Sequence, residues 1–189
     1  MARYELRLRV LDNHDKTETL DIDIEVRAPQ PQSAFHIGGA NFRFSYNINA
    51  IHSPTKVLAL DFEGVKGTGS DGNPISYFPA HNMSGSTGNI VSYNTFYSFG
   101  EGSPVDDQWQ PVGRIRFQVR DLNQALNLTW LFEGDGAGQG TIITQINTFD
   151  PQKGRYTLIS VKAEQEISHL RGTRFTDNNA IYAADTDIR

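Results

Sequence analysis

Oxygen-bearing side chains gather in several loops of the sequence. The stretches GTGSDGNP at 67–74 and FTDNN at 175–179 each offer carboxylate, hydroxyl, amide and carbonyl oxygens within a few residues. Hard oxygen donors of this kind suit Ca²⁺, although the EF-hand loop pattern is absent. Calcium therefore stays open as a cofactor, and no metal-binding residues are assigned. Asp21 and Asp23 share one face of an expected strand, and we interpret them as solvated surface.

Aromatic side chains outside the expected core supply a second kind of chemistry. Such rings stack on sugar faces while Asn and Asp bond the hydroxyls, and the same rings are enriched at protein interfaces. Both uses stay open for one set of residues. The candidate interface or ligand surface consists of Tyr77, Phe78, Tyr97, Trp109, Phe175 and Tyr182.

Catalytic signatures are missing from the sequence. The five histidines are scattered without metal-ligand spacing, and the absence of cysteine removes thiolate chemistry and disulfides. No serine occupies a nucleophile elbow. The segment GDGAGQG at 134–140 lacks the lysine and the following helix of a phosphate loop, so we interpret it as a hairpin connection. We expect no catalytic residues and no enzymatic activity.

Charge and hydropathy exclude two classes of partner. The 189 residues carry a formal net charge of −5 without a basic run, which excludes a nucleic-acid surface. No stretch approaches the roughly 20 apolar residues of a membrane span, so no membrane insertion is expected. The opening segment MARYELRLRV alternates like a strand and lacks the apolar region of a signal peptide. Any export signal would therefore lie outside this chain.

A two-residue hydrophobic period, typical of half-buried strands, dominates the chain. It predicts a hairpin over 4–27, in which the segment TLDIDIEVR alternates strictly. Further strands are predicted at 40–46, 56–63, 89–99, 112–120, 126–132, 141–148 and 155–163. About nine strands without crossover helices predict an all-β antiparallel sandwich, and we favour a jelly roll.

Three segments carry more detailed predictions. Phe42, Phe44 and Tyr46 share one parity and should lie between the sheets, after a bulge or a positive φ angle at Gly38 and Gly39. The segment 89–99 has apolar or aromatic residues on both faces, so both faces should be covered, either by another part of the same chain or at a subunit contact. One helical turn at 47–53 and a short helix at 163–171 are the only helical patterns.

Three motifs carry a family resemblance. IEVRAPQPQSAFHIGGANFRFSYN, PVGRIRFQVRD and LNLTW resemble the framework strands of a domain found in large secreted and cell-surface proteins of Bacteroidota, which is similar to cohesin-type β-sandwiches. The resemblance spans roughly residues 4–163 and implies a jelly roll that serves in adhesion, scaffolding or assembly. No sorting domain accompanies it.

The resemblance stops before the last part of the chain. We therefore divide the chain into a sandwich domain at 1–163 and a C-terminal extension at 164–189, whose apolar residues indicate that it docks. The resemblance implies a non-catalytic structural or adhesive module, secreted or at the cell surface, whose partners are proteins and include copies of itself. We favour docking of the extension on a neighbouring copy. The alternative is a carbohydrate-binding module that uses exposed aromatic residues.

Overall fold

The computed structural model describes residues 3–11, 18–57, 66–68, 74–76, 83, 86–95, 103–121, 123–132, 140–152, 155–163 and 181–183. In these residues the chain forms 13 strands and one short 3-10 turn, Pro31–Ser33, without an α-helix. Except for one parallel pair, β1 with β12, the strands pair antiparallel, which confirms the predicted all-β sandwich of jelly-roll type. The same residues include no helix long and apolar enough to cross a membrane.

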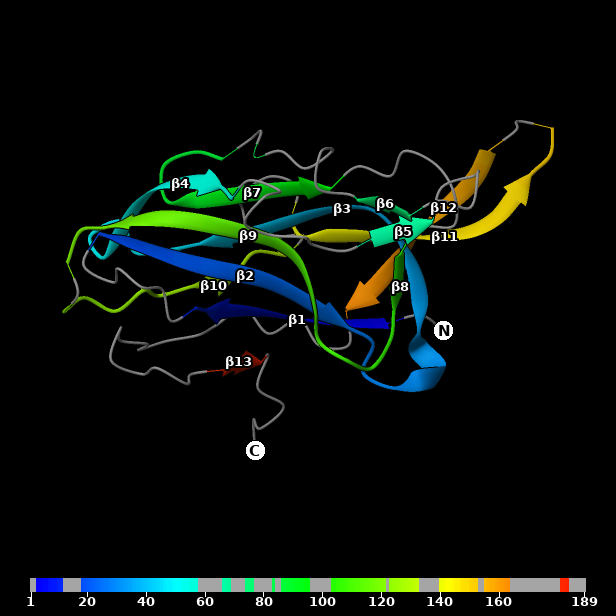
Figure 1. Cartoon of the computed structure of the whole chain (residues 1–189), viewed down its shortest axis with the longest axis horizontal. Helices are drawn as coiled ribbons and strands as arrows, with labels where there is room; N and C mark the ends of the chain where they lie inside the picture. The colour runs from blue at the N-terminus through cyan, green and yellow to red at the C-terminus, as the bar shows by residue number, and fades with distance from the viewer. Residues whose placement is uncertain are drawn as a thin grey trace.

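The first sheet is built on the opening hairpin of the chain. Its strands lie in the order β1 (Arg3–Val10), β2 (Thr19–Arg27), β9 (Gln110–Val119) and β4 (Ile51–Lys56). The tail adds β13 (Ile181–Ala183) to the free edge of β1. Figure 1 shows these strands side by side, with β4 and β13 at opposite edges.

The second sheet is centred on β3 (Phe35–Ser45). Its other strands are β7 (Ile90–Thr95), β8 (Ser103–Val105), β10 (Thr129–Trp130), β11 (Ile142–Asp150) and β12 (Arg155–Ala163). The two sheets are joined where β1 and β12 pair in parallel, Arg3 with Lys162 and Tyr4 with Ala163. A small separate hairpin consists of β5 (Lys66–Thr68) and β6 (Pro74–Ser76).

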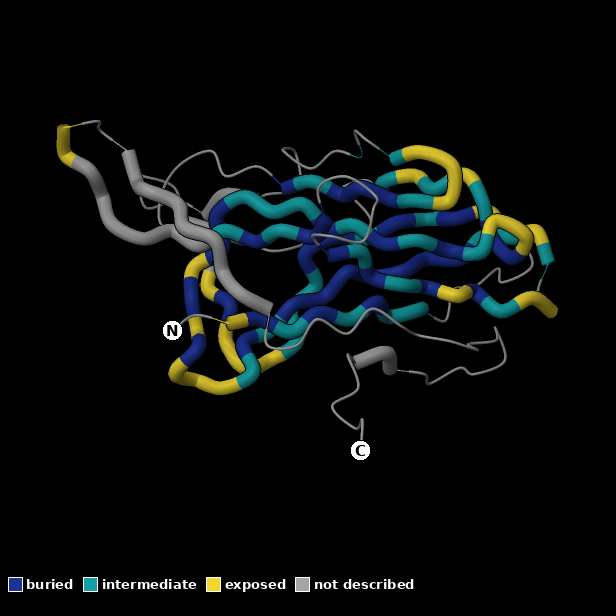
Figure 2. Tube along the Cα trace, turned by 180° about the vertical axis from the view of Figure 1, so that it is seen from behind, coloured by how far each residue is buried: buried dark blue, intermediate teal, exposed yellow. Residues whose placement is uncertain are grey.

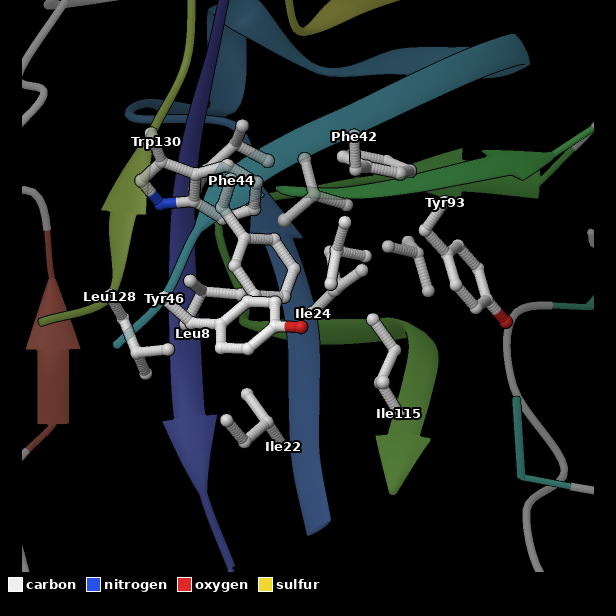
Figure 3. Packing of buried hydrophobic residues seen from close by; sticks show 14 of the residues in the cluster. Leu8, Ile22, Ile24, Phe42, Phe44, Tyr46, Tyr93, Ile115, Leu128 and Trp130 are labelled. Carbon is white, nitrogen blue, oxygen red and sulfur yellow. The ribbon is translucent and has the colours of Figure 1, made fainter. Parts of the chain in front are cut away.

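Three aromatic residues, two near the end of β3 and one directly after it, form the centre of the core. Phe42, Phe44 and Tyr46 are buried, as predicted. The Phe44 ring meets Trp130 edge-on at a centroid distance of 5.7 Å, and Tyr46 meets Phe117 at 5.0 Å. Figure 3 shows the rings of Phe44, Tyr46 and Trp130 among aliphatic side chains from β1, β2 and β9. Apolar residues of the two sheets therefore face each other, and Figure 2 shows buried residues, in dark blue, along the strands of both sheets.

Two local predictions for this core are confirmed, one of them in part. Ala40 pairs with Ile143 and Ile37 with Gln145, so β3 has one more residue than β11 between these pairs. The bulge falls at Gly38 and Gly39, and neither glycine has a positive φ angle. In β7 the second prediction holds in part: Val91 and Tyr93 are buried in the core and Ser92 on the opposite face is also buried, while Ile90 and Asn94 beside it are half-buried and 96–99 lie outside the described residues. The Ser92 hydroxyl donates to the Asn41 side chain at 3.0 Å, so the cover comes from the same chain.

Two predictions of secondary structure were wrong, and a third lies mostly outside the described residues. Of 47–53, residues 48–50 form a turn and 51–53 belong to β4, so no helix forms there. The Asn47 side chain holds the turn, because it accepts from the Asn49 amide at 3.0 Å and donates to the Ala125 carbonyl at 2.8 Å. Of the strand expected at 56–63, Lys56 is the last residue of β4 and Val57 is not strand, while 58–63 lie outside the described residues. Of 126–132 only Thr129–Trp130 is strand, because Asn127 has a φ angle of +47°.

The strand β4 contains a proline that sequence patterns place outside strands. Pro54 is tolerated because β4 is an edge strand and because its register against β9 shifts between His52 and Thr55. Ser53 adopts a φ angle of +51° at this shift. The helix expected at 163–171 starts on the last residue of β12 and otherwise lies outside the described residues.

Gly113 of β9 is required by the ring that lies against it. A Cβ atom at this position would lie 2.4 Å from Cε1 of Tyr93, a fully buried side chain with little room to move. We expect Gly113→Ala to lower the free energy of unfolding by about 1–3 kcal/mol in a urea titration, as overpacking does. Once Tyr93→Ala has removed the ring, adding Gly113→Ala should cost little more. Fully additive losses would contradict this contact.

Candidate functional site: an arginine face beside Trp109

Charged residues alternate with core residues along three neighbouring strands of the first sheet. Their side chains lie on the outer side of the sheet because the apolar residues of the same strands face the core. The carboxylates are Glu5 on β1 and Asp21, Asp23 and Glu25 on β2. The arginines are Arg7 and Arg9 on β1, Arg27 on β2, and Arg114 and Arg116 on β9. We call this set, together with Trp109, the arginine face.

The register of the strands brings opposite charges together. Asp23 lies opposite Arg9 on β1 and Arg114 on β9, and Asp21 lies opposite Arg116. Further along, Arg7 on β1 is opposite Glu25 on β2. In the last pair the charges are exchanged between the strands, because Glu5 is on β1 and Arg27 is on β2. Directly opposite residues are the ones whose side chains interact across a sheet. Every arginine of the face therefore has a carboxylate within reach.

The ion pairs are short, and those of β9 are made through two nitrogen atoms of each guanidinium group. Arg114 contacts Asp23 through Nε at 2.6 Å and Nη2 at 3.0 Å, and Arg116 contacts Asp21 in the same way at 2.7 and 2.8 Å. Arg9 Nη2 lies 3.1 Å from Asp23, so this carboxylate is shared by two strands. Two donors to one carboxylate fix the plane of each guanidinium. The arginines of β9 are thus held in one orientation.

The remaining pairs complete the row at the other end of the face. Arg7 Nε bonds the Glu25 carboxylate, which Arg9 Nε also approaches at 3.0 Å. Arg27 Nε donates to Glu5 at 2.6 Å. Asp23 and Glu25 are therefore bridged between arginines instead of being paired one to one, and buried charges are tolerated when they are paired in this way.

Burial differs sharply between the aspartates of β2 and the most exposed arginines. The Asp23 side chain has 0% exposure and that of Asp21 5%, whereas Arg9 and Arg116 are 41% and 42% exposed. The longer arginine side chains reach over the short carboxylates and cover them. Our interpretation of Asp21 and Asp23 as solvated surface was therefore wrong. These residues form a buried layer under an outer layer of guanidinium groups.

The electrostatic effect of this layering reaches the core. The side-chain hydrogen bond from Asp23 raises the pKa of Arg114 above its ordinary value. Tyr93 lies inside the sandwich, and its pKa is raised, first by burial and further by the charge of Asp23. Both residues therefore keep their usual charge state, cationic for Arg114 and neutral for Tyr93, throughout the neutral pH range.

Trp109 stands at one end of the face, on the loop that leads into β9. Asp106 shapes this loop: its carboxylate accepts from the Gln108 amide at 2.9 Å and from the Gln110 side chain at 3.0 Å. The Asp106 carbonyl accepts from the Ala28 amide at 2.6 Å, which ties the loop to the end of β2. The loop is thereby fixed, and it places the ring against the first sheet.

The Trp109 ring contacts two guanidinium groups. Cζ of Arg7 and Cζ of Arg27 lie 4.4 and 4.5 Å from the ring centroid, within the range of a cation–π interaction. A sugar platform needs open ring surface, and these contacts use ring surface of Trp109. The ring is better suited to a charged surface than to stacking on a sugar.

Of the other aromatic candidates, Tyr77, Phe78, Tyr97 and Phe175 lie outside the described residues. Tyr182 falls in β13, where only the backbone is described. The structure therefore places Trp109 alone among the predicted surface residues. Of the two stretches considered for Ca²⁺, 67–74 lies mostly and 175–179 entirely outside the described residues. Within the described residues no group of three or more His, Cys, Asp or Glu residues could hold a metal ion.

Comparison with known proteins gives structural likeness only. No family model matches the chain, and no curated protein matches it. The seventh ScaB type I cohesin from Pseudobacteroides cellulosolvens is similar, with 13% identity, 87% of this chain and 88% of that chain covered, and a TM-score of 0.46. A chain from the complex of a CaDoc0917 variant with CaCohA2 has 12% identity, coverages of 83% and 93%, and a TM-score of 0.45.

A third similar structure comes from a cellulosome scaffoldin. The CBM3a-L domain of scaffoldin cipA from the Clostridium thermocellum cellulosome has 14% identity, coverages of 64% and 69%, and a TM-score of 0.35. TM-scores below 0.5 at such identities do not establish a shared function. The fold and the site together define an antiparallel β-sandwich with an arginine-rich outer face.

Proposed function

We propose that this chain is a non-catalytic module that joins protein partners, including copies of itself, in an extracellular or cell-surface assembly. The observation that supports this role is the strand β13. Arg7, Leu8 and Arg9 of β1 pair antiparallel with the tail segment Ile181–Ala183. The edge of β1 therefore accepts an added strand, which is one of the common ways in which β proteins bind extended segments.

The same edge accounts for joining between copies. A tail strand that fits the β1 edge of its own chain has the sequence and register to fit the β1 edge of a second chain. Exchange of β13 between identical chains would give a closed pair or an open series, depending on the rotation between copies. The secreted or surface location rests on the resemblance of the framework motifs, and sugar binding by Tyr77, Phe78 or Tyr97 stays a prediction.

Light scattering after size exclusion tests the proposed joining. We expect the intact chain to form dimers or larger species in the micromolar range, and a chain ending at Ala163 to be a monomer. Tyr182→Pro in the full-length chain is the matched variant, because proline removes a backbone donor from β13 without shortening the tail. It should behave like the truncated chain. If all three chains are folded monomers, self-joining is wrong.

A further inference from the structure

We propose that the arginine face is a docking surface for an acidic, extended segment of a partner protein. This inference rests on the proposed role as a protein-binding module, but it names a surface other than the β1 edge. Its contacts would be the two most exposed arginines, Arg9 and Arg116, and the ring of Trp109. Three features support it: the layering of charge, the rigidity of the arginines and their spacing.

The layering determines which charge a partner meets first. Five arginines and four carboxylates belong to the face, an excess of one positive charge in a chain whose net charge is −5. The three carboxylates of β2 lie beneath, and the guanidinium groups of Arg9, Arg27 and Arg116 are the most exposed charges of the face. A partner that approaches this face therefore contacts cationic groups, and complementary partners carry carboxylates.

The arginines are fixed before any partner arrives. Arg114 and Arg116 are each held through two nitrogen atoms, and Arg9 bridges Asp23 and Glu25. Immobilising a long, flexible side chain is one of the costs of association. Here the buried carboxylates have already immobilised the arginines, so less conformational entropy remains to be lost on binding.

The spacing of the arginines favours an extended occupant. Arg7 and Arg9 are two residues apart on β1, as are Arg114 and Arg116 on β9, which places each pair about 6.6 Å apart along its strand. Alternate side chains of an extended peptide repeat at the same distance. A segment with carboxylates at every second position therefore matches the spacing of the arginines along a strand, and its carboxylates would contact Arg9 or Arg116, the more exposed arginine of each pair.

Trp109 supplies the apolar part of the surface. Tryptophan and arginine are the residue types that most often dominate binding energy at protein interfaces. The loop fixed by Asp106 holds the ring beside Arg7 and Arg27. Because the rest of the chain is acidic, a long polyanion that extends past the face is repelled, which favours a short protein segment over an acidic polysaccharide.

Calorimetry with a defined probe tests this inference. The probe is a short synthetic peptide in which aspartate alternates with threonine, and the control peptide has asparagine in place of each aspartate. We expect the full-length chain to bind the aspartate peptide at least tenfold more tightly than the asparagine peptide, with binding that weakens as salt rises from about 0.05 to about 0.5 M. Equal binding of the two peptides, or no binding of the aspartate peptide, overturns the proposal.

Two variants locate the binding surface. Arg9→Gln should weaken binding of the aspartate peptide by roughly tenfold, the effect of losing one charged hydrogen bond. This variant should still fold, because Asp23 keeps Arg114 and Glu25 keeps Arg7; a urea titration verifies this. Arg120→Gln is the matched control, since it removes the same charge from an exposed position after β9. An equal loss in both variants overturns the assignment to the arginine face.

Further arms separate this inference from its alternatives. Polygalacturonate is the glycan probe, and tighter binding of it than of the aspartate peptide would replace the protein partner by an acidic polysaccharide. Tyr182→Pro disrupts the tail strand but leaves the arginine face intact, so this variant should keep peptide binding while it loses self-association. If the intact chain self-associates but does not bind the aspartate peptide, only the docking surface is rejected. If it binds the peptide but does not self-associate, only the strand exchange is rejected.

Discussion

Replacing Asp23 with alanine is expected to lower the free energy of unfolding by about 3–5 kcal/mol, which is the range measured when one partner of a buried ion pair is removed. Asp23 has 0% side-chain exposure and bonds both Arg9 and Arg114. Its removal leaves the partly buried guanidinium of Arg114 without its bidentate carboxylate and leaves a small cavity under the face. Urea is the suitable denaturant, because a guanidinium salt would screen the charges under test.

The control for Asp23→Ala is a carboxylate that the face does not use. Asp107 is exposed, and its carboxylate accepts from the neighbouring Gln108 side chain at 3.1 Å. Asp107→Ala should change the free energy of unfolding by no more than about 0.5 kcal/mol. Asp23→Asn keeps the volume and removes the charge, and it should remain costly. A loss below about 1 kcal/mol for Asp23→Ala would show that the carboxylate layer does not stabilise the sheet.

The second large effect is expected in the core. Phe44→Ala should lower the free energy of unfolding by about 3–5 kcal/mol, because it removes a fully buried ring and leaves a cavity between the sheets. The ring also makes the edge-on contact with Trp130, and such aromatic pairs add stability beyond their buried area. A change in the fluorescence of Trp130 should accompany the loss.

Ile48 provides the matched truncation for Phe44. It is a large apolar residue with 43% exposure in the turn before β4. Ile48→Ala should cost no more than about 0.5 kcal/mol in the same urea titration. If Phe44→Ala costs less than about 1 kcal/mol, the ring is not part of the core, and the aromatic stripe on β3 would have to be reconsidered as a sugar platform.

The sequence could predict the sheets because the two-residue period is a local signal. It identifies β1, β2, β9 and β12 and the ring stripe of β3, and the paired glycines identify the bulge. It failed at Pro54 and at Asn127, where a register shift and a left-handed residue change the strand boundaries. The two-residue hydrophobic period contains no signal for a register shift or for a single left-handed residue.

The arginine face was missed for a different reason. A carboxylate on the outer side of an isolated strand is solvated. It becomes buried only when side chains of the adjacent strands cover it. Asp23 is 14 residues from Arg9 and 91 residues from Arg114, so its burial depends on the register of three strands. A usable signal was nevertheless present. Acidic residues alternate through β2 while arginines alternate through β1 and β9, and pairing these three segments would have predicted the ion pairs.

The edge of β1 also determines how the sandwich responds to mechanical tension. β13 runs antiparallel to β1, with Ala183 beside Arg7, so a pull between the segment before β1 and the segment after β13 opens this pair one hydrogen bond at a time. β12 runs parallel to β1, and the same pull loads their hydrogen bonds in shear, where they share the force. We therefore expect tension to separate β13 from β1 at a lower force than it separates β1 from β12.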